Sequence, residues 1–279
     1  HRVPALTVDV DDWVYATVPP PGIGGPVLAA MLLLMGGRPR GDWTPDDRAH
    51  LARVQGAVLR HRATHLDVAG DRVSAGQRLL DDVRRQGSAW LRTSPSTVHV
   101  SCVDGEGMAC AVTASSGYGS GVVTPGTGLM LNNCLGEPEL NRPGLHAWRP
   151  GDRLPSNMAP TVGRRADGAV LAIGSPGADR ITTALVQVLA ALGGGVGLQE
   201  AVDAPRLHVR PVRGGGLEVD HEADAELPLP TSGGEPLVAR EMPPHSMYFG
   251  GVAAAMRHPD GTLEAAADPR RAGAVVLVD

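Results

Sequence analysis

Three stretches of this sequence share one pattern, in which two short β-rich segments flank a glycine-containing turn. The first pair, TVHVSCVD and MACAVTAS, flanks GEG, and the other two stretches turn at ADG (166–168) and PDG (259–261). Turn residues between such segments predict β-hairpins, which join antiparallel strands. The chain is therefore expected to fold around antiparallel sheets.

Helical patterns precede and follow the hairpins. The apolar run 26–35 predicts a buried helix with Pro26 in its first turn, and it is too short to span a bilayer. Thr44 is expected to cap a second helix, which continues to residue 66. Apolar residues recur along this second helix at helical spacing: Leu51, Val54, Val58 and Leu59.

Two further helices are expected over residues 71–86 and 178–195, the latter ending at glycines. The apolar face predicted for the helix at 71–86 consists of Val73, Leu79, Leu80 and Val83. Helices therefore come first, then paired strands, then helices and strands again. This order predicts an α+β fold in which helices cover the outer faces of antiparallel sheets.

The composition excludes several classes of function. A net charge of -5 with 20% charged residues gives no footprint for nucleic acid or an anionic membrane surface. The three cysteines form no C-x-x-C pair, which argues against zinc-knuckle and redox motifs. Cys102 and Cys110 could face each other across a hairpin, although two buried thiols are the preferred interpretation.

His221 and Glu222 are expected in a solvated loop.

The sequence contains neither a signal peptide nor a membrane span, so the compartment stays open. It begins at HRVP without Met, which suggests a fragment or a processed product. The histidines show no metal-ligand spacing, and no metal or organic cofactor is implied.

Four segments rich in small polar residues suggest a site built from hydroxyls and backbone amides. G-x-S-x-G, Walker A and H-E-x-x-H signatures are absent from the sequence. The four segments are ST before the first hairpin, TASSGYGSG, PSNM and IGSPGADR. Glycine-rich turns leave N–H groups free and allow a substrate to approach closely, as oxyanion stabilisation requires.

Four motifs of this sequence resemble the γ-glutamyltranspeptidase family of N-terminal nucleophile hydrolases, and they occur in the order found in that family. The motifs are STVHVSCVDGEG, GSGVVTPGTGLMLNN, PSNMAPTV and GSPGADRITTALVQVL. The resemblance implies a four-layer αββα sandwich, here expected to lack its N-terminal part. It further implies that residues 1–96 are the end of a large-subunit-like segment. Residues 97–279 would be the small-subunit-like catalytic segment of one intertwined domain.

The resemblance implies that the chain is a zymogen that cuts itself between Ser96 and Thr97. Thr97 would then be both nucleophile and base, because a free α-amino group has a pKa of about 7.7 to 8.0 and can accept the hydroxyl proton. An acyl-Thr97 intermediate would form from a γ-glutamyl amide such as glutathione, and water or an amine would release it. The two cleavage products are expected to form a heterodimer.

Further roles follow from the resemblance. Ser115 matches the residue that orients the nucleophile, and Gly177 and Ala178 match the two glycines of the oxyanion hole. Ala178 departs from glycine, but its backbone N–H survives that change as a donor if φ is negative.

The remaining matches concern recognition of the substrate. Ser156 and Asn157 match two serines that hold the substrate α-carboxylate, and Glu137 matches an Asp that binds the α-amino group. Where the family has an Asn in the amino-group pocket, the shorter loop of this chain offers only Ser116 or Gly117, and Cys134 replaces a Gln. These departures leave open a specialised member that hydrolyses a different amide or carbon–acyl bond. A truncated binding module that never processes itself is the other alternative, because strands that lack neighbours have open edges.

Overall fold

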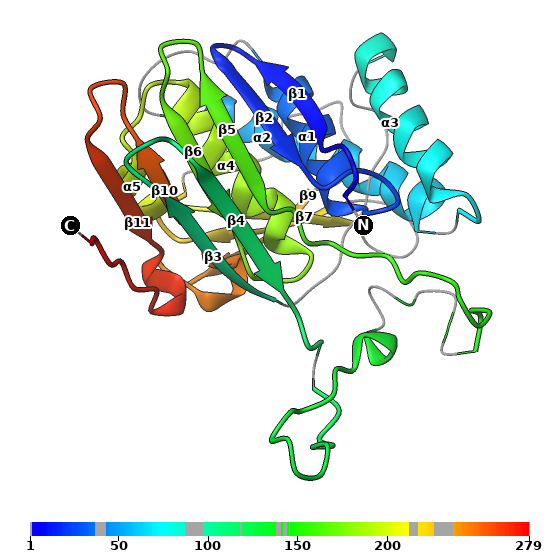
Figure 1. The fold of residues 1–279 in the computed structure, drawn as a ribbon. Coiled ribbons are helices and arrows are strands. Elements are labelled where there is room, and N and C mark those ends of the chain that lie inside the picture. Colours follow the sequence, from blue (N-terminus) through cyan, green and yellow to red (C-terminus); the bar gives the residue numbers. More distant parts are fainter. Residues whose placement is uncertain are drawn as a thin grey trace.

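A six-stranded sheet forms the centre of the fold, with strand order β1-β2-β5-β6-β10-β11 (Figure 1). Each neighbouring pair is antiparallel, and ADG and PDG lie at the turns that join β5 to β6 and β10 to β11. Both predicted hairpins are confirmed. The strands are β1 Leu6–Val10, β2 Trp13–Thr17, β5 Thr161–Arg165, β6 Val170–Gly174, β10 Ala253–Arg257 and β11 Leu263–Ala267. The computed structural model describes residues 2–36, 43–67, 69–86, 97–117, 119–137, 141, 144, 146–211, 217–225 and 237–278.

A two-stranded ribbon of β3 (Val98–Val103) and β4 (Ala109–Ala114) packs on one face of this sheet, against β6 and β10. The ribbon is the hairpin predicted at GEG. Its outer face is apolar and solvent-exposed, with Val98 65% and Val100 60% exposed.

Cys102 and Cys110 lie opposite each other in the ribbon, and both are exposed. The prediction of buried thiols is therefore wrong. Side chains alternate between the two faces of a strand, and the register that turns His99 and Ser101 towards the sheet turns Cys102 outwards.

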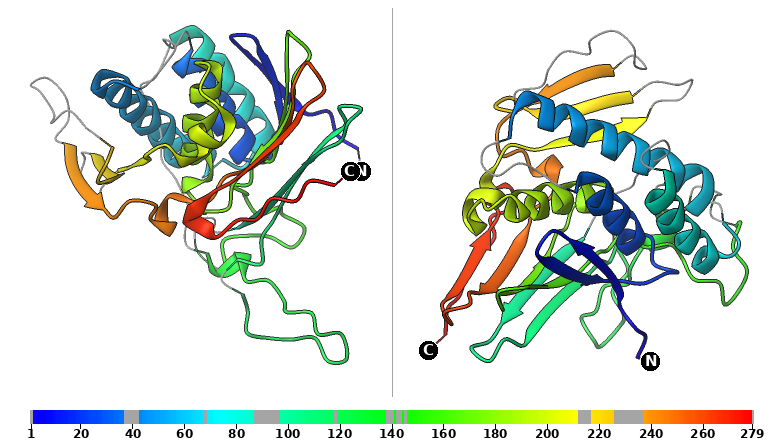
Figure 2. Two further views of the ribbon diagram at one scale, coloured as in Figure 1. Left: turned by 90° about the vertical axis from the view of Figure 1, so that its left-hand side faces the viewer. Right: turned by 90° about the horizontal axis from the view of Figure 1, so that it is seen from above.

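Helices cover the opposite face of the central sheet, so that ribbon, sheet and helices form successive layers (Figure 2). The helices are α1 Gly24–Met35, α2 Pro45–His61, α3 Arg72–Gln86, α4 Arg180–Gly193 and α5 Leu198–Asp203. A smaller sheet packs against α2 and α4 through its first strand. Its strands are β7 Leu207–Pro211, β8 Leu217–Glu222 and β9 Leu237–Met242, and the β8–β9 pair is parallel. The predicted α+β class is confirmed.

The helix predictions hold with two differences. Thr44 caps α2 through a capping box with Asp47, and the four apolar residues predicted for α2 are at most 1% exposed. From Arg62 to Leu66, however, this helix continues as a π-helix. Val73 is 54% exposed, so its place on the apolar face of α3 is wrong; it lies in the first turn, one residue after the helix begins. None of the helices in the described ranges is long and apolar enough to cross a membrane.

A cluster of four buried charged residues, Arg206, Glu222, Asp268 and Arg270, connects the smaller sheet to the end of the chain. Arg270 Nε donates to Glu222 at 2.8 Å, and Arg206 Nη2 lies 2.6 Å from Asp268. The expectation that His221 and Glu222 lie in a solvated loop is wrong, because β8 extends to Glu222 and buries both side chains.

This charged cluster also positions the segment before β10. Glu222 accepts a hydrogen bond from the Ser246 N–H at 3.0 Å, and Asp268 accepts one from the Val252 N–H at 2.8 Å. The segment 246–252 is therefore held at both ends by buried carboxylates.

Replacing one carboxylate of the cluster tests its contribution to stability. Glu222→Gln removes one of the two buried carboxylates that pair with the Arg270 guanidinium, the other being Asp268, so we expect the free energy of unfolding to fall by about 3 kcal/mol. Urea denaturation measures the change. Asp81→Asn, at the exposed Arg84–Asp81 pair, is the matched control and should cost no more than about 1 kcal/mol. Equal losses of unfolding free energy in both variants would show that the buried cluster contributes no more to stability than an exposed ion pair.

Candidate active site

Several predicted site segments emerge at one edge of the central sheet. Thr161 at the start of β5 pairs with Ile173 near the end of β6, and Gly174 pairs with Ala253 at the start of β10. The chain before β5, after β6 and before β10 therefore leaves the sheet at the same edge. Two predicted pairs, Ser156–Asn157 and Gly177–Ala178, lie on these segments.

Thr97 and Ser115 lie at the end of the ribbon, one residue beyond the Val98–Ala114 pair of β3 and β4. Both residues are half-buried, and Ser115 Oγ accepts a hydrogen bond from the Gly117 N–H at 3.0 Å. The structure thus brings the predicted nucleophile and its orienting hydroxyl to the same end of the ribbon. Ser96, on the other side of the predicted cleavage point, lies outside the described residues.

His99 connects the ribbon to this edge of the sheet, and sequence reasoning missed it. Its Nδ1 lies 2.7 Å from Thr113 Oγ1 and its Nε2 lies 2.8 Å from Ser101 Oγ. Ser101 Oγ in turn donates to the Ala253 carbonyl at 3.1 Å. The imidazole also presses on Gly174, where an added Cβ would lie 2.2 Å from the ring. The two-residue spacing from Thr97, which puts both side chains on one strand face, is the signal that could have identified His99.

Gly177 and Ala178 form the turn between β6 and α4, and both have positive φ angles, 126° and 67°. The negative φ expected as the condition for an Ala178 donor is therefore not observed. Neither N–H donates a hydrogen bond to another described residue, so both remain donors. The backbone takes this shape because Gly177 passes close to Gly250: a Cβ on Gly177 would lie 2.5 Å from the Gly250 Cα.

Ser156 and Asn157 lie against the start of α1. The Ser156 carbonyl accepts hydrogen bonds from the N–H groups of Ile23 and Gly24, both at 3.0 Å. A Cβ on Gly24 would lie 2.2 Å from the Asn157 carbonyl oxygen, so only glycine allows this approach. Ser156 Oγ accepts from the Met158 N–H at 3.2 Å, and the Asn157 side chain is 5% exposed.

The remaining predicted residues lie together in the loop after β4. Gly117 pairs with Asn133, and Glu137 Oε1 packs against Gly117. Burial raises the pKa of the Cys134 thiol, and the neighbouring Glu137 carboxylate raises it further. Ser116 is exposed, whereas Glu137 is fully buried. The structure therefore brings Ser116, Cys134 and Glu137 close to Ser115, with the Glu137 carboxylate beneath the backbone rather than open to solvent.

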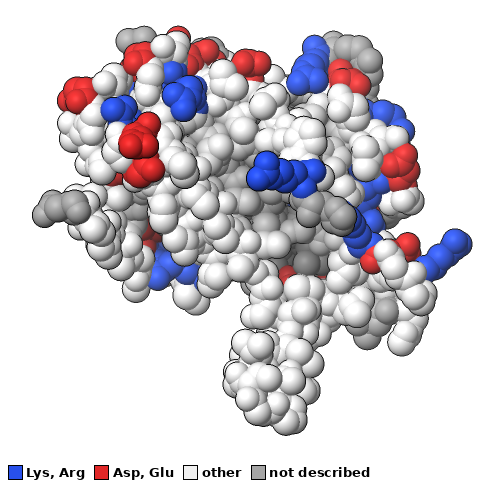
Figure 3. Space-filling view, viewed as in Figure 1, with Lys and Arg blue, Asp and Glu red and all other residues white. Residues whose placement is uncertain are grey.

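The loop itself projects from the body of the molecule and shows mainly uncharged side chains on the face in Figure 3. Its apolar residues are at least half exposed: Val122, Val123, Leu129, Met130 and Leu131. Hydrogen bonds within the loop, such as Thr124 N–H to the Leu129 carbonyl at 2.8 Å, hold its shape. This part of the site is consequently supported by local contacts rather than by the core.

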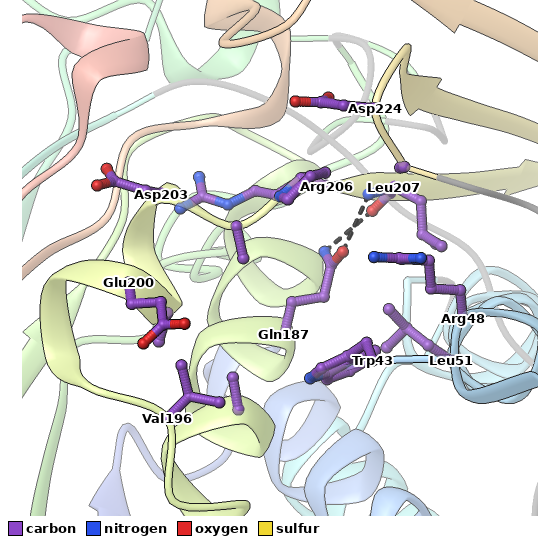
Figure 4. Close-up of a pocket in the computed structure, with 15 residues that line it drawn as sticks. Trp43, Arg48, Leu51, Gln187, Val196, Glu200, Asp203, Arg206, Leu207 and Asp224 are labelled. Carbon is purple, nitrogen blue, oxygen red and sulfur yellow. Dashed lines mark hydrogen bonds between the residues drawn. The ribbon is translucent and has the colours of Figure 1, made fainter. Parts of the chain in front are cut away.

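A separate cavity of about 760 Å³ lies among α2, α4, α5 and β7 (Figure 4). Gln187 of α4 lines this cavity. Its side-chain amide makes two hydrogen bonds with the Leu207 backbone, accepting from the N–H at 2.9 Å and donating to the carbonyl at 3.0 Å. None of the predicted site residues lines this cavity. The candidate active site is therefore the sheet edge.

Comparison with known proteins places these features in a family context. The family model described as Gamma-glutamyltranspeptidase matches residues 58–278. The acylase ACY 1 proenzyme of Pseudomonas sp. (strain V22) is 31% identical over 284 residues, covering 93% of this chain and 49% of that protein. The glutathione hydrolase proenzyme of Escherichia coli (strain K12) is 32% identical over 192 residues, covering 63% and 32%. The chain spans about half or less of the length of these relatives.

Solved structures show the same fold. A γ-glutamyltranspeptidase from Pseudomonas nitroreducens, complexed with L-DON, matches with a TM-score of 0.50 and 27% identity over 66% of this chain and 100% of that chain. A cephalosporin acylase from Bacillus halodurans matches with a TM-score of 0.68 over 96% of this chain and 52% of that chain, at 21% identity. The predicted sandwich of the N-terminal nucleophile hydrolase type is thereby confirmed.

Two neighbouring substitutions test the geometry of the turn after β6. Gly177→Ala drives a Cβ into Gly250 and should lower the free energy of unfolding by about 2 kcal/mol or more. Ala178→Gly relieves an unfavourable φ at an entropic cost, so we expect a change within about 1 kcal/mol. Thermal unfolding of both variants measures the difference. A Gly177→Ala variant as stable as the wild-type protein would contradict the close approach of Gly177 to Gly250.

Proposed function

Because the chain belongs to the γ-glutamyltranspeptidase family, we propose that it cuts itself before Thr97 and then hydrolyses or transfers γ-glutamyl groups. The observation that carries this proposal is the placement of Thr97 opposite Ser115 at the end of a ribbon that packs on β6 and β10. Strand β6 leads to the turn of Gly177 and Ala178, whose N–H groups donate to no other described residue. Acyl transfer by a hydroxyl uses a nucleophile with its base, here the Thr97 hydroxyl and α-amino group, and backbone donors for the oxyanion.

Self-cleavage uses the same hydroxyl as turnover. Thr97 Oγ attacks the Ser96 carbonyl carbon, the bond from that carbon to the Thr97 nitrogen breaks, and an ester replaces the amide. Water then hydrolyses the ester, which leaves a carboxylate on Ser96 and a free α-amino group on Thr97. This amine is the base that the uncut chain lacks.

In turnover, the α-amino group of Thr97 accepts the Oγ proton while Oγ attacks the substrate γ-carbonyl. The N–H groups of Gly177 and Ala178 donate to the oxyanion, and Ser115 orients the nucleophile. The proton passes to the leaving amine as the amide bond breaks, and acyl-Thr97 remains. Water or a second amine attacks this ester and regenerates the hydroxyl.

Recognition of the substrate is assigned to the segments around the nucleophile. Ser156 and Asn157 would hold the α-carboxylate, and Glu137 would hold the α-ammonium group with Ser116 and Cys134 as neighbours. The Glu137 charge favours an ammonium group strongly only if that group reaches a site shielded from water.

A second candidate is the hydrolysis of an acyl amide without an α-ammonium group. The complete burial of Glu137 beneath Gly117 favours it, because this carboxylate is not open to solvent. The similarity of this chain to an acylase proenzyme from Pseudomonas is consistent with such a shift in substrate.

The two cleavage products are expected to stay together as a heterodimer. Residues 1–96 contribute β1 and β2 to the central sheet, and β2 pairs along its whole length with β5 from residues 97–279. Helix α1 of the first segment packs on α4 of the second. Separating the segments would leave β5 unpaired along the side that β2 covers and would expose much of the core. Both segments therefore belong to one intertwined domain.

Intact-mass spectrometry of the purified full-length protein tests self-cleavage. Two fragments that break between Ser96 and Thr97 are expected, together with a single uncut mass for Thr97→Ala. Thr97→Ser keeps the hydroxyl and should still cut. A single uncut mass for the wild-type protein would refute the nucleophile assignment and favour a non-processing binding module.

The substrate class is tested with γ-glutamyl-p-nitroanilide and glutaryl-p-nitroanilide, which differ only in the α-amino group. If Glu137 binds that group, Glu137→Gln should lower kcat/KM about tenfold or more for the γ-glutamyl compound and leave the glutaryl compound nearly unchanged. Release of p-nitroaniline is measured by absorbance. A wild-type preference for the glutaryl compound would instead support the second candidate.

A further inference from the structure

We propose that His99 is a positioning residue, which sets the distance between the nucleophile on the ribbon and the oxyanion donors on the central sheet. The proposal rests on the proposed function, because it assigns a purpose to the separation of Thr97 from Gly177 and Ala178. His99 is two residues from Thr97, roughly 7 Å along a strand, so it acts through the backbone and not by touching the substrate.

The hydrogen bonds of His99 form a chain with one direction. Ser101 uses its single hydroxyl proton on the Ala253 carbonyl, so its oxygen must accept from His99 Nε2–H. His99 Nδ1 is then the unprotonated nitrogen and accepts from the Thr113 hydroxyl. The chain runs from Thr113 on β4 through His99 and Ser101 on β3 to Ala253 on β10. It therefore connects both ribbon strands to the sheet.

The hydrogen-bond chain requires a neutral His99 imidazole, and burial of the ring keeps it neutral. Burial lowers the pKa of His99 to about 4, so the ring is uncharged at neutral pH. A protonated ring would donate from both nitrogens, and the Thr113 hydroxyl would lose its acceptor.

The hydrogen-bond chain of His99 ends next to the turn that carries the proposed oxyanion donors. Ala253 pairs with Gly174, the residue against which the His99 ring packs, and Gly174 precedes Gly177 by three positions. At the other end, Thr113 on β4 precedes Ser115 by two residues. A shift of His99 would therefore move the ribbon relative to the turn that carries the donors. Misplacement of reacting groups by about 1 Å can lower a rate about 100-fold.

Thr113→Val tests this role, because valine keeps the branched shape and removes the hydroxyl. We expect kcat towards the better p-nitroanilide substrate to fall about 10- to 100-fold while KM changes less than about threefold. Self-cleavage before Thr97 should slow in the same variant. Ser101→Ala breaks the other end of the chain and should have the same effect, which covers the case that Thr113→Val does not fold. Thr7→Val, at an exposed position of β1, is the control and should leave kcat unchanged.

Rescue separates positioning from general stabilisation. His99→Gln retains an amide donor and an acceptor and should keep more of kcat than His99→Phe, which retains only a ring. A loss of thermal stability with unchanged kcat in Thr113→Val and Ser101→Ala would overturn the positioning role alone, since the wild-type enzyme would still be active. An uncut and inactive wild-type protein would overturn the proposed function as well.

Discussion

The pairing of β2 with β5 is the contact on which the rest of the structure depends. It aligns Trp13 with Arg165 and Thr17 with Thr161, and so joins the chain before Thr97 to the chain after it within one sheet. The pairing also fixes where α1 begins, because the chain leaves β2 and reaches Gly24 against the Asn157 carbonyl. The sheet edge that carries the candidate site is therefore assembled from both parts of the sequence.

The candidate site is divided between two layers that are connected by polar contacts. Thr97 and Ser115 lie at one end of the ribbon, whereas Gly177 and Ala178 lie in the turn that follows β6 of the central sheet. The His99 hydrogen-bond chain connects the layers from the ribbon side. On the sheet side, the buried cluster of Arg206, Glu222, Asp268 and Arg270 holds the segment 246–252, whose Gly250 packs on Gly177. Buried charges persist only when each is paired, so this cluster is well suited to give one defined arrangement.

Chemistry and recognition are supported differently. The proposed nucleophile and donors lie next to the ends of β3 and β6, whereas Ser116, Cys134 and Glu137 lie on a projecting loop held mainly by its own hydrogen bonds (Figure 1). Loops tolerate changes in sequence that sheet edges do not. Under the proposed function, substrate preference can therefore change while the acyl-transfer chemistry is kept.

The sequence by itself determined the hairpins, the α+β class, the capped helix at Thr44 and the family, because turn residues, periodicity and ordered motifs are local signals. It predicted which residues the site would contain, and the structure brings Thr97 to Ser115 and Ser116 to Cys134 and Glu137. Only the tertiary structure decided the outward direction of Cys102, the positive φ of Ala178 and the burial of Glu222. Each of these depends on strand register or on a contact with a distant segment, and neither is written in the neighbouring residues. The same holds for His99, whose partners on β4 and β10 come together only when the ribbon packs on the sheet.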